Sequence, residues 1–254
     1  MTDAANTDQQ SLLPLFYKNP MPVEIERHRE WKVKQRRSFA YAAGTNAVPV
    51  VADEFPALQA HYPLVFTSGD QPTVVALMGL RPNENLFIEA DGSWKKGHPI
   101  PAYVRRYPFV LMETENRDRL ILCVEEDPAV VGTDGEFPLF DGDKASDAGN
   151  DALNFCGMFN QSAQATTVFC QELKAAGLLV EQRADLVLPD QRRVTLSGFS
   201  IVDEKKFNEL PDEKWLEWRK RGYIGLVYAH MLSLGRWNVL TDLAADRGQE
   251  TAAA

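Results

Sequence analysis

A pattern repeated around two Tyr-Pro steps constrains the fold of this chain more than any other feature of its sequence. Residues 55–67 read FPALQAHYPLVFT and residues 100–112 read IPAYVRRYPFVLM, an offset of 45 residues. Proline disfavours the α conformation in the residue before it, so Tyr62 and Tyr107 should each end a short helix and begin extended chain. The same offset aligns the apolar runs 75–77 and 120–122 as second strands. We therefore expect a duplicated helix–strand–strand unit whose two copies pair into one sheet.

Two long helices are predicted in the C-terminal half. Apolar residues recur every three or four positions over 148–176, and Gly177 follows as a C-terminal cap. A second helix is expected over 211–234, where Gly222 and Gly225 would indicate close backbone packing. The predicted fold class is therefore α+β, with a mixed or antiparallel sheet that carries the internal duplication and is covered by these two helices.

Shorter elements complete this prediction. The turn residues 189–191 separate two strand-like runs and predict a hairpin. Asp53 and Asp203 precede short helical segments and are expected to cap them. The remaining predicted strands are 38–42, 47–51 and 85–89.

The domain organisation expected from composition is simple. Residues 1–14 are polar and acidic and are expected to form a disordered tail. Residues 15–240 are expected to form a single domain, and 241–254 a frayed tail rich in alanine. Residues 127–147 are rich in Gly, Asp and Pro, and we expect a long functional loop there.

Charge and hydropathy exclude several classes of function. The formal net charge of −9 opposes nucleic-acid binding. No apolar run approaches the roughly 20 residues that span a bilayer, so no membrane span is expected. The first ten residues lack a basic region followed by an apolar one, and the three cysteines form no CxxC pair. Both observations favour a cytoplasmic location, with three buried free thiols.

Motifs for cofactors and covalent catalysis are not recognisable in the sequence. The four histidines and three cysteines have no metal-ligand spacing, and there is no phosphate-binding glycine loop or nucleophile elbow. We therefore expect no metal and no cofactor. An enzyme, perhaps a hydrolase or transferase, would need a site assembled in space, with His61, His98 or His230 beside a carboxylate in a deep pocket.

The best binding candidate is the run Arg105-Arg106-Tyr107, with Trp94 upstream. Two arginines beside aromatic rings can hold a carboxylate or phosphate. The other copy of the repeat has Ala60 and His61 where the arginines stand. The alternative is that both arginines are surface residues paired with Glu113 or Glu115.

His230 and the basic segment 27–37 can each be interpreted in two ways, as structural or as functional. His230 lies on an apolar stretch, which favours a core histidine over a ligand. The basic segment 27–37 is either a solvated face or a contact for an anionic partner.

Several motifs spread over residues 15–240 resemble the bacterial SapC family. The resemblance is carried by these segments: Phe16-Tyr17-Lys18-Asn19-Pro20, 43–49 (AGTNAVP), 62–66 (YPLVF), 103–109 (YVRRYPF), 196–199 (LSGF) and 229–234 (AHMLSL). The resemblance implies association with surface-layer or TonB-dependent uptake systems. It also carries a permease label that conflicts with the lack of a membrane span. We interpret the chain as a non-enzymatic binding or accessory protein, with a protein or a small anionic ligand as partner, rather than as an enzyme.

Overall fold

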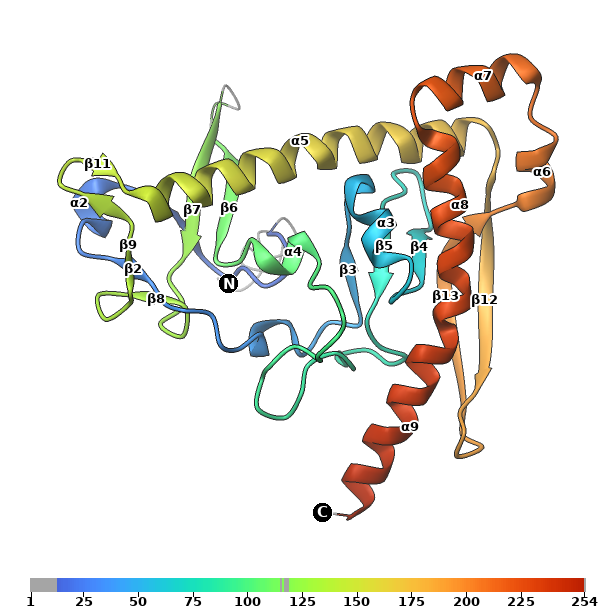
Figure 1. The fold of residues 1–254 in the computed structure, drawn as a ribbon, viewed down its shortest axis with the longest axis horizontal. Coiled ribbons are helices and arrows are strands. Elements are labelled where there is room, and N and C mark those ends of the chain that lie inside the picture. The colour runs from blue at the N-terminus through green and yellow to red at the C-terminus, as the bar shows by residue number, and fades with distance from the viewer. Residues whose placement is uncertain (1–12, 115, 117–118, 254) are drawn as a thin grey trace, which may run out of the picture. The chain divides into compact units, whose positions relative to one another are not determined.

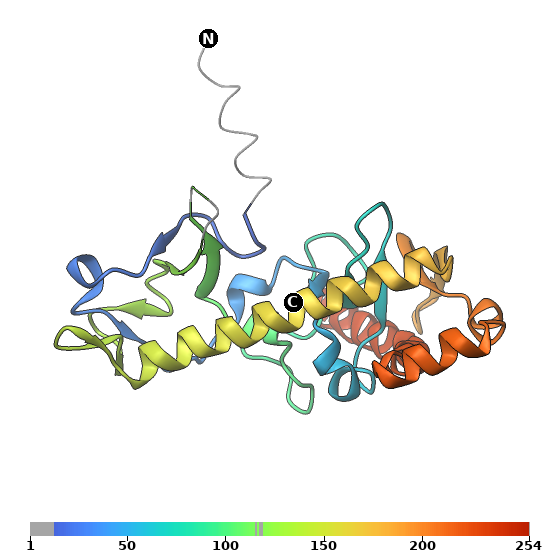
Figure 2. The same cartoon turned by 90° about the horizontal axis from the view of Figure 1, so that it is seen from above.

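The protein folds into an α+β structure with antiparallel sheets (Figure 1). The computed structural model describes residues 13–114, 116 and 119–253. These form two compact units. The first unit comprises the described residues up to Arg37 together with Arg105–Asn160, and the second comprises Ser38–Val104 with the described residues from Gln161 onward. Helix α5 (Asp147–Ala175) is one uninterrupted helix that belongs to both (Figure 2).

The first unit is built on a three-stranded sheet of order β1-β7-β6. A second small sheet has the order β8-β2-β9, and β10 pairs with β11 as a hairpin. Its strands are β1 (Pro20–Pro22), β2 (Lys32–Val33), β6 (Phe109–Glu113), β7 (Leu120–Glu125), β8 (Val131–Gly132), β9 (Phe137–Pro138), β10 (Phe140–Asp141) and β11 (Lys144–Ala145), and its first helix is α2 (Ile25–His28). The segment 127–147, predicted as a loop, thus contains four short strands.

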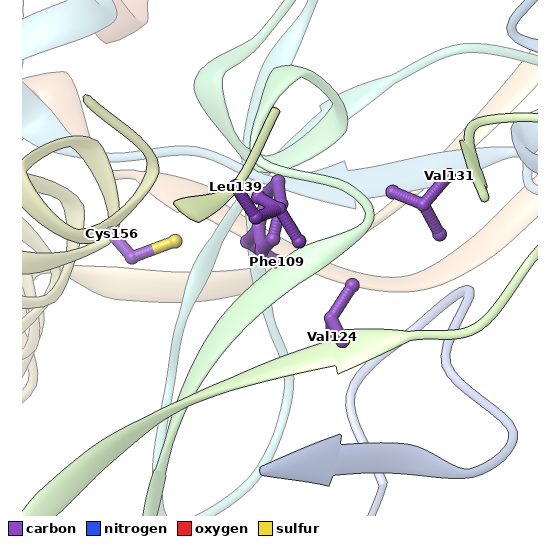
Figure 3. Close-up of a cluster of buried hydrophobic side chains, with 5 residues drawn as sticks. All are labelled: Phe109, Val124, Val131, Leu139 and Cys156. Carbon is purple, nitrogen blue, oxygen red and sulfur yellow. The ribbon is translucent and has the colours of Figure 1, made fainter. Parts of the chain in front are cut away.

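A compact apolar cluster forms the core of the first unit (Figure 3). The Sγ atom of Cys156 points from helix α5 toward Phe109 and Leu139, and Val124 and Val131 complete the cluster. All five side chains are at most 5% exposed. The N-terminal part of α5 therefore belongs to this core.

The second unit contains a five-stranded antiparallel sheet of order β12-β13-β4-β5-β3. Helix α8 packs against β4 and β13. The strands are β3 (Ala47–Pro49), β4 (Leu64–Thr67), β5 (Val74–Leu77), β12 (Leu179–Val187) and β13 (Arg193–Val202). The helices are η1 (Ala40–Ala42), η2 (Ala52–Glu54), α3 (Phe55–Leu58), α4 (Ala102–Arg105, at the boundary of the units), α6 (Glu204–Asn208), α7 (Asp212–Lys220), α8 (Tyr223–Ser233), η3 (Leu234–Arg236) and α9 (Trp237–Ala253).

Several local predictions are confirmed. Gly177 follows the end of helix α5 as its C-terminal cap, in a left-handed conformation with φ 68°, and the Leu178 N–H is bonded to the Leu173 carbonyl oxygen. The hairpin β12–β13 turns at 188–192. The Asp203 carboxylate caps α6 by accepting a hydrogen bond from the Lys206 N–H.

The prediction of one shared sheet is wrong. Both Tyr-Pro segments have the order helix, strand, strand, but β4–β5 lie in the five-stranded sheet and β6–β7 in the three-stranded one. Their registers also differ, because Leu64 pairs with Ala76 whereas its counterpart Phe109 pairs with Val124, three residues beyond the counterpart of Ala76. The common order of elements does not by itself establish a duplication.

The predicted helix 211–234 is interrupted. Gly222 adopts φ 76° and separates α7 from α8, since the left-handed conformation is accessible to glycine. A Cβ built on either Gly222 or Gly225 meets no atom within 4 Å, so the close packing inferred from these glycines is also wrong.

Three other element predictions fail. Residues 38–42 contain the 3₁₀ turn η1 instead of a strand, and 85–89 contribute one isolated bridge, Ile88 to Trp94. Asp53 lies inside η2 and does not cap α3, whose N-cap residue is Glu54. These short segments satisfy their backbone groups through turns, which periodicity does not detect.

The ends of the chain were both predicted to be tails. Residues 1–12 of the predicted N-terminal tail lie outside the described residues. Helix α9 continues through 241–253, where a frayed tail was expected. In the part of the chain that the structure describes, no helix has the length and apolar character needed to cross a bilayer.

Candidate functional site: a three-arginine pocket

A pocket of about 270 Å³ lies within the first unit and contains three arginines. Its walls come from the chain around β2, from the start of β6, from β9 and from the first turns of α5. The lining residues are Val33, Arg36, Arg105, Arg106, Phe109, Phe137, Ala148, Asp151, Ala152, Phe155 and Cys156. Here the structure brings two of the predicted site residues, Arg105 and Arg106, to one concave surface.

Arg36 ties its own segment to the segment that carries the other two arginines. Its guanidinium donates one hydrogen bond to the backbone carbonyl oxygen of Arg105, 2.7 Å away, and another to that of Tyr107. These bonds span about 70 residues of sequence. Arg36 therefore fixes the backbone from which Arg105 and Arg106 extend.

The other two guanidinium groups lie over aromatic rings. The Cζ atom of Arg105 is 5.1 Å from the centre of the Phe155 ring, and that of Arg106 is 4.7 Å from the centre of the Phe159 ring. Such cation–π contacts orient a guanidinium and partly desolvate it. Arg105 is exposed and Arg106 is half-buried.

Tyr107 fixes the chain next to Arg105 and Arg106. Its ring is buried, and its hydroxyl donates a hydrogen bond of 2.8 Å to the Asp127 carboxylate. Burial, reinforced by Asp127, raises the pKa of Tyr107 far above its ordinary value. The phenol thus stays protonated and positions the chain, and it does not line the pocket.

Helix α5 adds its positive end to the pocket. Ser146 caps the helix, since its hydroxyl accepts a hydrogen bond from the Gly149 N–H at 3.2 Å. Ala148, Asp151 and Ala152 from the first turns face the pocket. The helix dipole and three guanidinium groups favour an anion, and they are opposed within the lining by the single carboxylate of Asp151.

The one thiol in the lining is unsuited to covalent chemistry. Burial raises the pKa of Cys156 to about 11, although Arg106 acts in the opposite direction. The thiol therefore remains protonated at neutral pH. All three cysteines are free and buried, as expected, and burial also raises the pKa of Cys123.

The predicted residues Trp94 and His61 belong to the second unit and do not line this pocket. Trp94 is buried and donates to the Tyr62 hydroxyl at 3.3 Å, which in turn donates to the Pro99 carbonyl oxygen at 2.7 Å. The ring centres of His61 and His98 are 5.3 Å apart. Burial first, and then the nearby His61 and Lys95, lower the pKa of His98.

His230 is a fully buried histidine of the second unit. Its Nδ1 atom lies 2.8 Å from the Leu64 carbonyl oxygen, and its Nε2 atom accepts a hydrogen bond from the Val202 N–H at 3.1 Å. Burial lowers its pKa to about 4. The ring is therefore neutral at physiological pH and links α8 to two strands, as a core histidine does.

Sequence reasoning missed Arg36 as a member of the site. The signal was present in the basic segment 27–37, for which an anionic contact had been one of two interpretations. Of the carboxylates proposed as alternative partners of the arginines, Glu113 ends β6 and Glu115 lies outside the described residues. Among the described residues, no group of three or more His, Cys, Asp or Glu side chains could hold a metal ion.

The fold and the pocket define an α+β protein with an arginine-lined cavity. The chain belongs to the SapC family, because the family model described as SapC matches residues 23–240. No curated protein and no solved structure matches it.

Proposed function

We propose that this SapC-family protein is a non-enzymatic binding protein that recognises a small anionic ligand through the pocket of Arg36, Arg105 and Arg106. The observation that carries the proposal is the gathering of three guanidinium groups in one 270 Å³ pocket of a chain whose net charge is −9. An acidic protein repels anions at long range, so three guanidinium groups in one pocket favour a local role in binding an anion.

The chemistry of the lining supports a carboxylate or a phosphate as the recognised group. A guanidinium presents paired N–H donors that match two oxygens of either group. Phe109, Phe137 and Phe155 add apolar walls, which suit a ligand with a flat or aliphatic body. The volume is slightly below the usual range for ligand sites, so the ligand is small.

Binding is favoured over catalysis by the side chains of the pocket. Arginine remains charged at all physiological pH values and does not exchange protons there. The Cys156 thiol is held protonated, which removes the nucleophile. His61, His98 and His230, the residues on which an enzyme hypothesis depended, do not line this pocket.

The accessory role belongs to the same proposal. A cytoplasmic protein that binds a small anion would serve a surface-layer or TonB-dependent uptake system by holding or sensing a ligand. Cell fractionation tests the location, and purification of the protein from native lysate tests for a protein partner.

Titration calorimetry with phosphate and with benzoate, at fixed ionic strength, tests the binding proposal. Arg105→Gln should weaken binding by roughly tenfold or more, the value of one charge-assisted hydrogen bond. Arg183→Gln is the matched control, since Arg183 is 65% exposed on β12 and pairs with Asp185. Equal affinity in both variants would contradict the site. If neither anion binds, but Arg105→Gln loses a protein captured by the wild type, a protein partner replaces the small ligand.

A further inference from the structure

A second pocket in the first unit has a different chemical character. Its volume is about 450 Å³, within the range of small-molecule sites. It lies between strands β1 and β7, the β10–β11 hairpin and the first turns of α5. Gly149 and Leu153 of α5 line it, whereas other residues of the same turns line the arginine pocket.

Apolar side chains form most of the wall. Val23, Leu122 and Phe140 pack against the core of the first unit on one side and line the pocket on the other. They are only partly buried because the pocket leaves that second side open. Leu153, at the rim, is 46% exposed. An apolar concavity of this kind favours an apolar ligand body.

Gly149 allows helix α5 to pack closely against the chain at Leu139. A Cβ built there would lie 2.5 Å from the Leu139 carbonyl oxygen, a distance that real contacts do not reach. Glycine is otherwise unfavourable within a helix. Its presence allows α5 to approach Leu139, which also lines the pocket.

Two residues of opposite charge, Arg119 and Glu24, are among the lining residues, and both are exposed. Arg119 precedes β7, and its carbonyl oxygen accepts a hydrogen bond from the Thr114 N–H at 3.0 Å. The β1–β7 register pairs Pro22 with Cys123, and the Val23 N–H donates to the Leu122 carbonyl oxygen at 2.9 Å. Glu24 therefore leaves β1 beside the first residues of β7, the strand that Arg119 precedes. The lining therefore combines a cation, an anion and an otherwise mainly apolar surface.

We propose that this pocket binds an apolar α-amino acid in its zwitterionic form. Arg119 holds the carboxylate, Glu24 holds the ammonium group, and the apolar wall holds the side chain. A fatty acid would satisfy Arg119 but would be repelled by Glu24, and an amine would have the reverse difficulty. The inference does not depend on the arginine pocket, because no arginine is common to the two linings.

Three probes with the same phenyl body separate these charges. The test is calorimetric titration of the full chain with L-phenylalanine, 3-phenylpropionate, which lacks the ammonium group, and phenethylamine, which lacks the carboxylate. The titrations are repeated in Arg105→Gln, so that binding of a carboxylate in the arginine pocket is not mistaken for this site.

Phenylalanine should bind more tightly than either of the other probes, by up to about fivefold per charge pair, because Arg119 and Glu24 are both exposed. Arg119→Gln should weaken phenylalanine binding and leave phenethylamine unchanged. Glu24→Gln should weaken phenylalanine binding and leave 3-phenylpropionate unchanged or stronger.

Filling the pocket gives an independent test. Leu153→Trp, or Ala145→Trp if the first variant folds poorly, should reduce phenylalanine binding at least tenfold. The control Leu216→Trp, at a leucine of the second unit that is 48% exposed, should not change it. The proposal is overturned if wild-type protein does not bind phenylalanine, if Leu153→Trp and Ala145→Trp bind as wild type does, or if all three probes bind alike and respond to neither charge variant.

Discussion

The buried ring of His230 should make the second unit lose stability in mild acid. Its two nitrogens are bonded to backbone groups of β4 and β13, and burial lowers its pKa to about 4. An unfolded histidine has a pKa of about 6.5. Above that value the ring is neutral in both states and contributes no pH dependence. As the pH falls below about 6.5, the unfolded state binds the proton first, so the free energy of unfolding decreases until about pH 4.

The size of this effect follows from the two pKa values. One pKa unit corresponds to about 1.4 kcal/mol, so the full loss between them is about 3 kcal/mol, and the loss from pH 7 to pH 4.5 is about 2.5 kcal/mol. His230→Gln removes the titration and keeps an amide near the same backbone groups. At pH 7 it should destabilise the protein by roughly 1–3 kcal/mol, because part of the bonding is lost. At pH 4.5 its disadvantage relative to the wild type should be smaller by about 2.5 kcal/mol.

Ser233→Ala is the matched control on the same helix. Its hydroxyl accepts a hydrogen bond from the Leu64 N–H at 2.9 Å but does not titrate, so its destabilisation should be equal at both pH values. Urea unfolding followed by tryptophan fluorescence is a suitable assay, since Trp94, Trp215, Trp218 and Trp237 all lie in the second unit. A difference between wild type and His230→Gln that stays constant from pH 7 to pH 4.5 would refute the reasoning.

Three further predictions concern stability and reactivity. Gly149→Ala should destabilise the protein by about 1–3 kcal/mol, because its Cβ would meet a carbonyl oxygen at 2.5 Å. Gly157→Ala on the same helix, where a Cβ would lie in open space, should stabilise the protein by up to about 1 kcal/mol. The opposite order of stabilities in urea unfolding would contradict this. Asp203→Ala should cost about 1 kcal/mol through loss of the α6 cap, with Asp203→Asn close to wild type in the same assay. Burial raises the pKa of Cys156 to about 11 and of Cys170 to about 12, so a thiol reagent at pH 8 should react slowly with native protein and fully in urea. Rapid reaction of the native protein would show that the thiols are accessible.

The features that the sequence predicted well are those set by interactions between residues close together in the sequence. Gly177 ends α5, and Asp203 caps α6, through hydrogen bonds to backbone groups at most a few residues away. The β12–β13 hairpin is of the same kind, since its turn lies between its strands. The end of the short helix before the Tyr107-Pro108 step was also predicted, because proline disfavours the α conformation in the preceding residue whatever the tertiary contacts are.

The features that failed depend on partners distant in sequence. Tyr62 and Tyr107 stand in similar local patterns, yet β4 pairs with β13 while β7, the partner of β6, pairs with β1. Strand pairing is chosen by burial against the rest of the chain, which a local pattern does not contain. Arg36 was missed for the same reason, since its bonded partner Arg105 lies 69 residues further along the chain.

The arginine pocket also decides how the acidic character of the chain should be understood. At physiological ionic strength, exposed charges are screened beyond about 8 Å. An anion inside the pocket therefore responds mainly to the three guanidinium groups, the first turns of α5 and Asp151, and weakly to the rest of the net charge of −9. The net charge acts instead on approach, because it slows the encounter with anions, and its opposition to polyanions such as nucleic acids stays a prediction. Under the proposed function, a small anion would enter such a field at little cost, whereas a long one would meet many acidic side chains, so the same charge distribution would select for ligand size as well as for sign.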